Sequence, residues 1–544
     1  MALKTTKMKK TISLVIFSLL LLTTYPQQVQ IVWQQCYGGS DMDTGKDVIV
    51  LNNGHILVLS TTYSNSGDIG FNQGKSDFWL FETDAFGNFL WGKTYGGSEN
   101  EYAKSLVQTP DGGYVMFGDT DSNNGDVSGN HGSFDYWVIK TDNIGNVLWH
   151  RCLGSTKRDL ATGFNIDEAG NIYCIGLSSG EDGDVTQNNG YDDYWFVKLD
   201  LDGELIWNRN LGGSYADNGL CISSTNDGGV IVGGIISSID GDITCNMVLG
   251  NKTAWVIKLD SLNSIQWQQC YGGTYTETVV EIESTSDGGY ILLGATNSND
   301  GDVSGFHGYP GDVNIYDIWV IKVDSMGVIE WQRCLGGTKD ESPSFIKITP
   351  DGNYLVGGFT YSSDGDVSGN HSNSVGSDHW VVKLDPSGEI IWQQCFGGIT
   401  EDELYGGYVI SESEYVFVGN RRTSSTGGNI DCNAIGGFGD WDLVMYKILD
   451  TTVGISTIEE DKLPLKVYPN PAANSATFSY NLPDGIQQGS IEVHNTTGLL
   501  VASTSLNEAK GEWVLQLNNI PPGLYIYTLS TQQKTTTGKL VVTR

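Results

Sequence analysis

The segment QIVWQQCYGG, residues 30–39, places a tryptophan in a run of β-favouring residues that ends at two glycines. Val, Ile, Trp and Tyr are typical of strands, and glycine permits a tight turn. We interpret the segment as one strand followed by a turn. No strand-like segments precede it to act as its partners. Its partner strand must therefore come from elsewhere in the chain.

The same pattern returns six more times, at tryptophan spacings of 58, 58, 58, 60, 64 and 61 residues. The seven tryptophans are Trp33, Trp91, Trp149, Trp207, Trp267, Trp331 and Trp392. A second tryptophan also recurs in each period, as Trp79, Trp137, Trp195, Trp255, Trp319, Trp380 and Trp441. A fixed period of this kind indicates a repeat architecture.

Each period predicts four antiparallel strands. In residues 102–152 the strand-like runs are YAKSLVQT, YVMFGDT, DYWVIKTD and NVLWHRC, separated by the turn PDGG, by an Asp-rich loop and by the turn NIGN. Such turns favour hairpins, and no segment shows a helical period of 3.6 residues. Four strands in about 60 residues fit one blade of a β-propeller.

The chain ends decide the number of blades. Residues 30–39 form a fourth strand without the first three, and the last period stops after its third strand, DWDLVMYKIL, at residues 440–449. The N-terminal strand therefore completes the last blade, because a linear stack leaves both edges exposed. We predict an all-β protein in which residues 30–450 form a seven-bladed, four-stranded β-propeller closed by the N-terminal strand.

The third and fourth strands share the pattern D-x-x-G-x-x-x-W, as in DNIGNVLW at residues 142–149 and DPSGEIIW at residues 385–392. This resembles the tryptophan-docking repeats of quinoprotein propellers. The resemblance implies that the fourth-strand tryptophans pack between neighbouring blades. The adjacent cysteine pair expected over a bound quinone is missing, so we expect no quinone.

The net charge of the chain limits the kinds of binding partner to expect. The 544 residues include 30 Lys and Arg against 65 Asp and Glu, a net charge of −35. Nucleic acids and anionic membranes attract cationic surfaces, so neither is an expected partner. A cation, a basic protein or a neutral glycan suits this charge better.

The N-terminus reads as an export signal. Four lysines precede the apolar run TISLVIFSLLLL, residues 11–22, which is too short for a membrane-spanning helix. We assign residues 1–27 to a signal peptide, with the cleavage position open, and predict no transmembrane segment in the mature chain.

Residues 465–544 form a separate small β domain after a linker at 451–464. This domain carries a set of motif residues: Tyr468, Pro469, Asn470, Pro471, Gly523, Tyr525 and Lys539. The segment resembles the type A sorting domain of the type IX secretion system of Bacteroidota. That resemblance implies an immunoglobulin-like β-sandwich, Sec export, contact with the type IX machinery, and a secreted or surface-attached protein. The alternative is an ordinary immunoglobulin-like binding module.

The loop between the second and third strands carries the most regular polar pattern, as in NDGDVSGFHG at residues 299–308. We number it from the residue two before its recurrent Asp. Oxygens at positions 1, 3 and 5, a glycine and an acid at position 12 are typical of a calcium loop. The candidate calcium ligands are Asp126, Asp135, Asp182, Asp184, Asp193, Asp300, Asp302, Asp364 and Asp366. The alternative is an Asx-turn that every blade copies.

Two further sets accompany this loop. Position 8 is histidine in three blades, His131, His307 and His371, which we expect to be solvated. An acid follows each Gly-Gly turn, as Asp43, Glu101, Asp159, Asp217, Glu277, Glu341 and Asp402. These acids either form an electronegative ring on one face or cap the amides of their own turns, and the second interpretation is favoured.

Nine cysteines are present, and five occupy the position three residues after a fourth-strand Trp: Cys36, Cys152, Cys270, Cys334 and Cys395. Equivalent positions in neighbouring blades lie too far apart for a disulfide. Cys245 and Cys432 occupy matching loops of blades that are not adjacent. We predict buried thiols and no regular disulfide framework.

The sequence contains no G-x-S-x-G, H-E-x-x-H or P-loop motif. We favour a secreted or cell-surface, non-catalytic binding or adhesion scaffold with a glycan or protein ligand. A polysaccharide-degrading propeller that uses loop carboxylates and a structural surface-layer component are the alternatives. The insertion GYPGDVNIYD in the fifth blade is the most distinctive candidate for a ligand contact.

Overall fold

The computed structural model describes residues 29–544 apart from short gaps. The gaps are residues 246–251, 373–375, 423–426, 433–434, 437–440, 453–464, 470–471, 483–487, 496–499, 519, 532–534 and 544. The chain divides into two compact units, Met1–Thr452 and Val453–Arg544. The predicted signal peptide and most of the predicted linker therefore lie outside the described residues. No helix of the described part is long and apolar enough to cross a membrane.

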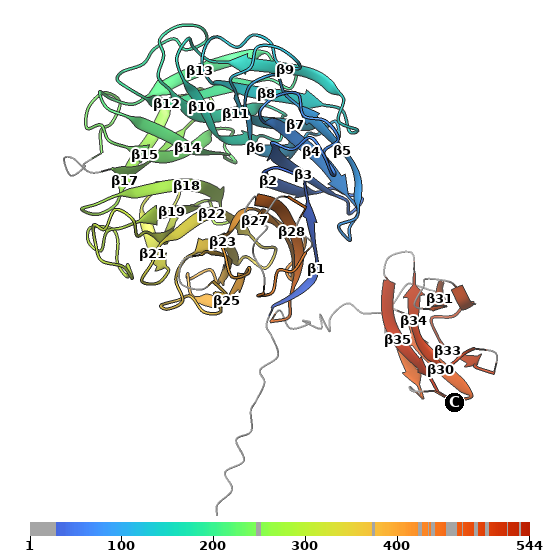
Figure 1. Cartoon of the computed structure of the whole chain (residues 1–544). Helices are drawn as coiled ribbons and strands as arrows, with labels where there is room; N and C mark the ends of the chain where they lie inside the picture. The colour runs from blue at the N-terminus through green and yellow to red at the C-terminus, as the bar shows by residue number, and fades with distance from the viewer. Residues whose placement is uncertain are drawn as a thin grey trace, which may run out of the picture. The chain divides into compact units, whose positions relative to one another are not determined.

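The first unit consists of seven four-stranded antiparallel sheets arranged in a ring (Figure 1). Blade 1 contains β2 (Asp43–Val50), β3 (Ile56–Thr62), β4 (Asp77–Thr83) and β5 (Phe89–Tyr95). Blade 2 contains β6 (Glu101–Gln108), β7 (Tyr114–Thr120), β8 (Asp135–Thr141) and β9 (Val147–Leu153). Blade 3 contains β10 (Asp159–Ile166), β11 (Ile172–Ser178), β12 (Asp193–Leu199) and β13 (Leu205–Leu211).

The remaining blades follow the same order. Blade 4 contains β14 (Asp217–Ser224), β15 (Val230–Ile236), β16 (Thr253–Leu259) and β17 (Ile265–Tyr271). Blade 5 contains β18 (Glu277–Ser284), β19 (Tyr290–Thr296), β20 (Asp317–Val323) and β21 (Ile329–Leu335). Blade 6 contains β22 (Glu341–Ile348), β23 (Tyr354–Thr360), β24 (Asp378–Leu384) and β25 (Ile390–Phe396). Blade 7 contains β26 (Asp402–Val409), β27 (Glu414–Arg422), β28 (Trp441–Asp450) and β1 (Val29–Tyr37).

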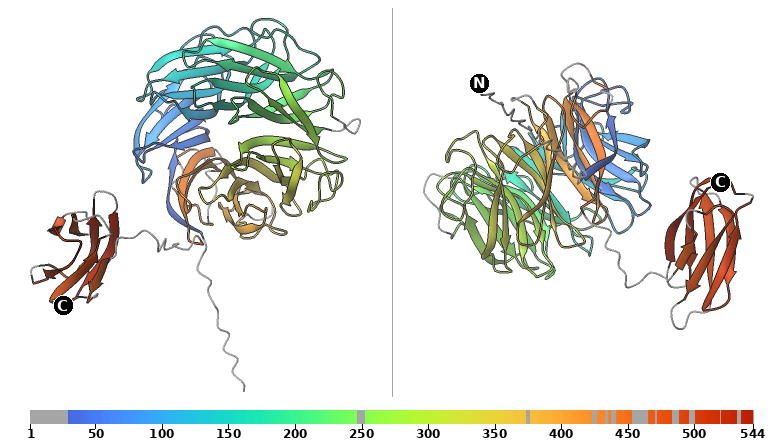
Figure 2. Two further views of the ribbon diagram at one scale, coloured as in Figure 1. Left: turned by 180° about the vertical axis from the view of Figure 1, so that it is seen from behind. Right: turned by 90° about the horizontal axis from the view of Figure 1, so that it is seen from below.

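Strand β1 closes the ring. It pairs antiparallel with β28, from Val29 opposite Asp450 to Tyr37 opposite Leu443. The first and last described strands of the propeller thus share one sheet, as the views in Figures 1 and 2 show. The prediction that the N-terminal strand completes the last blade is confirmed. Both orphan edges disappear in this pairing.

Tryptophan docking joins each blade to the next. Trp33 Nε1 donates to the carbonyl of Ala85, in the turn between β4 and β5, at 3.1 Å. A Cβ on Gly87, whose φ is +80°, would lie 2.9 Å from the Trp33 ring. Glycine is therefore favoured here for two reasons: its backbone adopts a left-handed conformation, and the neighbouring indole leaves no space for a Cβ. The corresponding bonds in other blades are Trp149 to Leu201, Trp267 to Ser325 and Trp331 to Pro386.

The second unit contains two sheets that share one core. The first sheet is formed by β29 (Leu465–Tyr468), β30 (Ser475–Asn481) and β33 (Lys510–Gln516). The second is formed by β32 (Leu500–Leu506), β31 (Gly489–Asn495), β34 (Gly523–Ser530) and β35 (Thr535–Val542). Phe478, Ile491 and Leu529 are fully buried in the core between them. The unit is a small β-sandwich, and its immunoglobulin-like character stays a prediction.

Candidate functional site

The recurrent loop Asp clamps its loop onto the Gly-Gly turn that precedes the blade. In blade 5, Asp302 N donates to Gly272 O at 3.0 Å, and Gly272 N donates to Asp302 Oδ2 at 3.1 Å. Gly301, with φ of +64°, brings the two segments together, because a Cβ there would lie 2.4 Å from Gly272 O. The position-3 carboxylate thus has a structural partner in its own blade.

Positions 1 and 5 also have partners. Asp300 Oδ1 accepts from Thr274 N at 2.7 Å, and Asp364 in blade 6 accepts from Thr338 N at 2.8 Å. The hydrogen bond from the Thr274 hydroxyl, followed by that from its amide, lowers the pKa of Asp300. Ser304 at position 5 accepts from Gln332 Nε2, on the outer strand, at 2.6 Å. These oxygens hold the loop to its neighbours.

The position-12 Asp binds position 8 of its own loop. Asp135 Oδ2 accepts from the amide of His131 at 2.9 Å and lies 2.7 Å from its Nδ1. His131 Nε2 then reaches Asp184 of the next blade at 3.7 Å. His307 makes the same bridge, 2.6 Å to Asp317 and 3.7 Å to Asp366 in the next blade. The expectation that these histidines are simply solvated is wrong, because each lies against a buried carboxylate.

Histidine is not required for this contact between blades. Gln73 in blade 1 donates to Asp126 in blade 2, and Asn189 in blade 3 donates to Asp242 in blade 4 at 3.1 Å. Position 12 accepts a hydrogen bond from position 8 of its own loop, and position 8 in turn contacts position 3 of the following blade. A calcium loop instead needs position 12 near positions 1 and 3 of its own loop. No group of three or more His, Cys, Asp or Glu side chains in the described residues is arranged to hold a metal ion. Calcium in these loops stays a prediction.

The seven acids after the Gly-Gly turns are buried. Each accepts a hydrogen bond from the amide four residues earlier, for example Gly39 N to Asp43 at 2.7 Å and Gly337 N to Glu341 at 2.9 Å. The other five donors are Gly97, Ser155, Gly213, Gly273 and Gly398. At most 1% of each of these acidic residues is exposed. They therefore cap their own turns and do not form an open electronegative surface.

Each turn lies between two carboxyl groups. A Cβ on Gly96 would lie 2.3 Å from Asp77 Oδ1 and 2.6 Å from Glu101 Oε2. In the described structure, Oδ1 of Asp77 and of Asp193 is buried without a hydrogen-bond partner. Burial, reinforced by the charge of the next blade's acid, raises the pKa of Asp77 and of Asp193 to about 7. A buried, unpaired oxygen favours the neutral acid.

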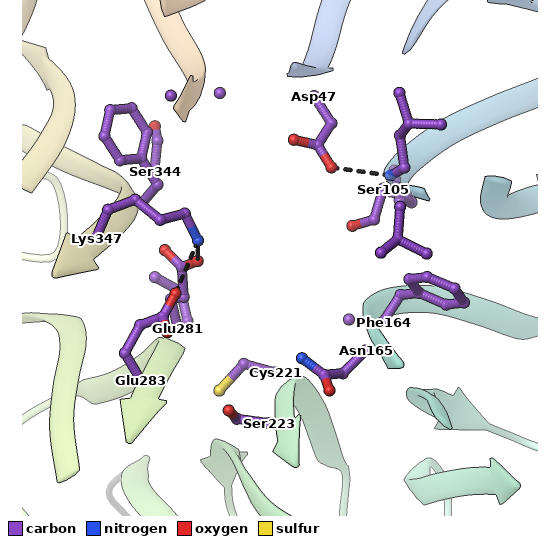
Figure 3. Close-up of a pocket in the computed structure, with 18 of the residues that line it drawn as sticks. Asp47, Ser105, Phe164, Asn165, Cys221, Ser223, Glu281, Glu283, Ser344 and Lys347 are labelled. Atoms are coloured by element: carbon purple, nitrogen blue, oxygen red, sulfur yellow. Dashed lines mark hydrogen bonds and ion pairs between the residues drawn. The ribbon is translucent and has the colours of Figure 1, made fainter. Parts of the chain in front are cut away.

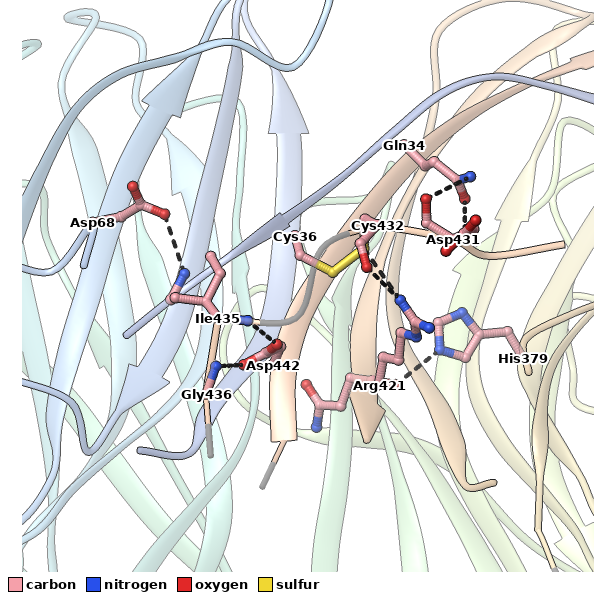
Figure 4. Close-up of a disulfide and its surroundings, with 12 residues drawn as sticks. Gln34, Cys36, Asp68, His379, Arg421, Asp431, Cys432, Ile435, Gly436 and Asp442 are labelled. Atoms are coloured by element: carbon pink, nitrogen blue, oxygen red, sulfur yellow. Dashed lines mark hydrogen bonds between the residues drawn. A yellow bond between two sulfur atoms is a disulfide. The ribbon is translucent and has the colours of Figure 1, made fainter. Parts of the chain in front are cut away.

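Two disulfides are present, and the prediction of no disulfide framework is wrong. Cys36 pairs with Cys432 in blade 7 (Figure 4), and Cys245 pairs with Cys270 in blade 4, both with a Cα separation of 5.6 Å. Each joins position 6 of the loop to the outer strand of the same blade. The prediction compared different blades, whereas the partner lies within one blade. Cys152, Cys334 and Cys395 have glycine at the facing loop position and are buried free thiols.

The insertion in blade 5 presents Tyr309, which is 80% exposed. Within the insertion, Gly311 packs against Tyr275, since a Cβ there would lie 2.4 Å from the Tyr275 ring. The predicted ligand contact thus lies at the surface and is attached to the turn before β18. Asp312 in the same insertion accepts hydrogen bonds from Asn297 Nδ2 and from Asn314 N, both at 3.0 Å.

The central channel encloses a cavity of about 720 Å³. Figure 3 shows side chains from the inner strands that converge on it. Lys347 Nζ lies 2.5 Å from Glu281 Oε1 and 3.0 Å from Glu283 Oε1. Asp47 Oδ2 accepts from the amide of Leu106 in the neighbouring blade at 2.8 Å. Sequence reasoning did not single out any of these residues.

A β-bulge in every inner strand supplies a ring of channel residues. The pairing between first and second strands skips one residue in each blade, as between Gly45 and Asp47. The skipped residues are Lys46, Lys104, Thr162, Leu220, Val280, Ser344 and Tyr405. All seven line the channel. A bulge residue has no partner in the hydrogen-bonded strand pairing, and its side chain changes direction. Its identity can therefore differ between blades without disturbing the strand pairing of the repeat.

The predicted sorting residues lie partly in the described structure. Tyr468 is 47% exposed, and its hydroxyl donates to Glu512 Oε1 at 2.7 Å. Tyr525 is buried and donates to Pro521 O at 2.7 Å. Gly523 begins β34, and Lys539 lies in β35. Asn470 and Pro471 lie outside the described residues.

Comparison with known families places the second unit. Residues 466–543 match the secretion system C-terminal sorting domain. The C-terminal unit is a type IX sorting domain. The protein is therefore exported by the type IX system to the cell surface or the extracellular space.

The chain also matches other proteins at lower similarity. The chain is 25% identical over 176 residues to the regulatory protein FlaEY of Caulobacter vibrioides, which covers 31% of this chain and 18% of the relative. A puromycin hydrolase structure matches with 13% identity and a TM-score of 0.42, over 81% of this chain and 59% of the other. A polysaccharide lyase of family PL25, an ulvan lyase, matches with 9% identity and a TM-score of 0.42, over 71% and 93%.

Proposed function

We propose that the propeller is the non-catalytic binding module of this exported protein, and that its glycan or protein ligand binds in the central channel. One observation carries the proposal. The seven positions of the bulge ring hold six residue types, whereas the loop carboxylates repeat from blade to blade and are engaged in hydrogen bonds. Ligand sites concentrate where a concave surface offers a few convergent polar groups.

The polysaccharide-degrading alternative draws support from the acids of the same channel. Asp47 and Glu281 face it, and a glycosidase needs two carboxyl groups. Each of the two is already bonded to the backbone of the neighbouring blade, Asp47 to Leu106 N and Glu281 to Ile346 N. A capping role explains both acids, so binding without turnover is the function we favour. A screen of purified polysaccharides for released sugar tests the alternative.

We also propose the route of export. A Sec signal in residues 1–27 delivers the chain to the periplasm, and the C-terminal unit then directs it through the outer membrane. Either release or attachment to the surface follows. Deleting residues 465–544 would leave the protein in the periplasm, as cell fractionation would show. Normal surface delivery of the deleted form would contradict the route.

A channel-blocking substitution tests the binding function. Ser105 faces the channel (Figure 3), so Ser105→Trp fills part of it. Thr186→Trp adds the same bulk on an exposed loop and is the matched control. On glycan and peptide arrays, we expect the full chain and Thr186→Trp to capture the same ligand and Ser105→Trp to lose it. Capture by all three proteins would contradict the proposal.

A further inference from the structure

Two lysines stand on adjacent bulges of the channel. Lys46 and Lys104 occupy the same position in blades 1 and 2. No carboxylate oxygen of the described residues lies within 4.0 Å of Lys46 Nζ. Lys46 Nζ instead lies over the Tyr405 ring, 4.2 Å from its centroid. The partly buried Lys46 ammonium therefore has an aromatic neighbour and no ion-pair partner.

The second lysine is only loosely paired. Lys104 Nζ lies 3.8 Å from Asp119 Oδ2, and Asp119 also accepts the amide hydrogen of Ala161 through its other oxygen. The cations of Lys46 and Lys104 therefore repel each other across a cavity with little compensation. Like charges held together without an intervening anion raise the free energy of the empty site.

Besides the paired charges of Lys347, Glu281 and Glu283 and the carboxylate of Asp47, the channel offers hydroxyl, amide and aromatic groups. Asn165 and Ser223 line its wall, and Tyr405 and Phe164 supply aromatic rings. This combination suits a hydroxylated ring that stacks on one side and forms hydrogen bonds on the other. A peptide would need an open groove with unpaired strand amides, whereas amides of the inner strands such as Leu106 N are already capped.

We propose that the channel binds an acidic sugar, with the sugar carboxylate between Lys46 and Lys104 and the ring against Tyr405. This inference rests on the proposed function, because it assigns a ligand class to the same cavity. In the empty channel the two lysine cations repel each other. A bound carboxylate removes this repulsion, which increases the affinity for the sugar.

The charge state of Lys46 supports this assignment. Burial, and then the neighbouring charge of Lys104, lowers its pKa to about 8, against the opposing influence of Glu403. The other groups that face it are the Tyr405 hydroxyl, which donates to Glu403 at 2.7 Å, and Asp47 on its own strand. A bound carboxylate favours the charged ammonium, so binding raises the Lys46 pKa and takes up protons.

Calorimetry on the full chain tests the inference. The probes are glucuronate, neutral glucose and the non-sugar acid N-acetylglutamate. We expect glucuronate to bind, and Lys46→Met and Lys104→Met each to weaken it by about tenfold, as for loss of one charge-assisted hydrogen bond. Lys157→Met, on an exposed loop, is the control and leaves binding unchanged. At pH 8, buffers of different ionisation enthalpy should report uptake of about half a proton, because Lys46 is then half charged.

The outcomes distinguish the acidic-sugar ligand from the more general proposal that the channel is the binding site. Equal binding of glucose and glucuronate, or no effect of either lysine variant, overturns the acidic sugar while the channel function stands. Tighter binding of N-acetylglutamate than of glucuronate overturns the sugar and favours a peptide carboxylate. Loss of the array ligand in Ser105→Trp would still support the channel as the site. Array capture that Ser105→Trp leaves intact overturns both.

Discussion

Two regions of the propeller differ in how strictly their residues repeat. One is the loop face, formed by the Asp-rich loops and the Gly-Gly turns, and the other is the channel. On the loop face the same acids recur in nearly every blade, and hydrogen bonds tie them to turns and to the next blade. In the channel the same strand position carries Lys, Thr, Leu, Val, Ser or Tyr in different blades. Repetition on the loop face therefore builds the ring, whereas variation in the channel is where specificity can arise.

The strongest way to break this comparison is to open the ring. The bond between Cys36 and Cys432 ties the N-terminal strand to the last blade across a sequence separation of 396 residues, whereas Cys245 and Cys270 are separated by 25. Removing both cysteines of the first pair should cost about 3–5 kcal/mol, because a longer loop loses more closure entropy. Alanine at Cys245 and Cys270 is the matched control. Urea unfolding measures both, and an equal or larger loss in the control would contradict the ring-closing role.

A buried turn acid should matter nearly as much. Glu341→Ala leaves Gly337 N and the Thr360 hydroxyl without their acceptor inside the protein. We expect a loss of about 2–3 kcal/mol in the free energy of unfolding, the usual cost of orphaned buried donors. Glu341→Gln keeps an acceptor and should lose less. A Glu341→Ala protein as stable as the wild type would show that the turn does not need its cap.

The pH dependence of stability comes from the same loop face. Burial raises the pKa of Asp77, Asp193 and Glu341 to about 7, from ordinary values of 3.8 and 4.5. Between pH 4 and 7 the folded chain therefore binds more protons than the unfolded chain, so stability falls as pH rises. The carboxylates that contact His131 and His307 raise their pKa values, which acts in the same direction. We expect a higher Tm at pH 5 than at pH 8, with a smaller difference in Asp77→Asn/Asp193→Asn. A higher Tm at pH 8 would contradict this account.

The smallest expected effect is that of calcium. Positions 1 and 3 already accept amide hydrogens, and position 12 accepts the amide hydrogen of position 8 in its own loop. A chelator should therefore change the Tm of the full chain by no more than about 1 °C, because a ligand that binds weakly stabilises little. A rise of several degrees with added calcium would instead support the calcium sites that the loop pattern suggested.

The repeat made most of the fold predictable. The strand at residues 30–39 lacks the first three strands of a blade, and the last period lacks the fourth. Together they predicted that the N-terminal strand closes the ring. The disulfides were also within reach, since Cys245 and Cys432 stand at loop position 6 in the two blades that pair a loop cysteine with an outer-strand cysteine. The signal was missed because cysteines were compared between blades rather than within one.

The channel was not predictable in the same way. Lys46, Lys104 and Tyr405 look like ordinary members of three strands until the pairing register is known. A bulge shifts the side-chain alternation by one residue, so a pattern of buried and exposed positions cannot say which residue is skipped. The capping of the turn acids was the favoured prediction, because an acid four residues after a glycine can reach back to its amide.

The most direct test of the account compares one channel variant with one loop variant. Lys46→Met alters the channel, and Asp300→Asn alters a repeated loop contact to Thr274. Binding of the array ligand and Tm are measured for both full-length proteins. The account predicts that Lys46→Met weakens binding about tenfold while Tm is kept, and that Asp300→Asn lowers Tm while binding is kept. Loss of binding in Asp300→Asn with unchanged binding in Lys46→Met would contradict it.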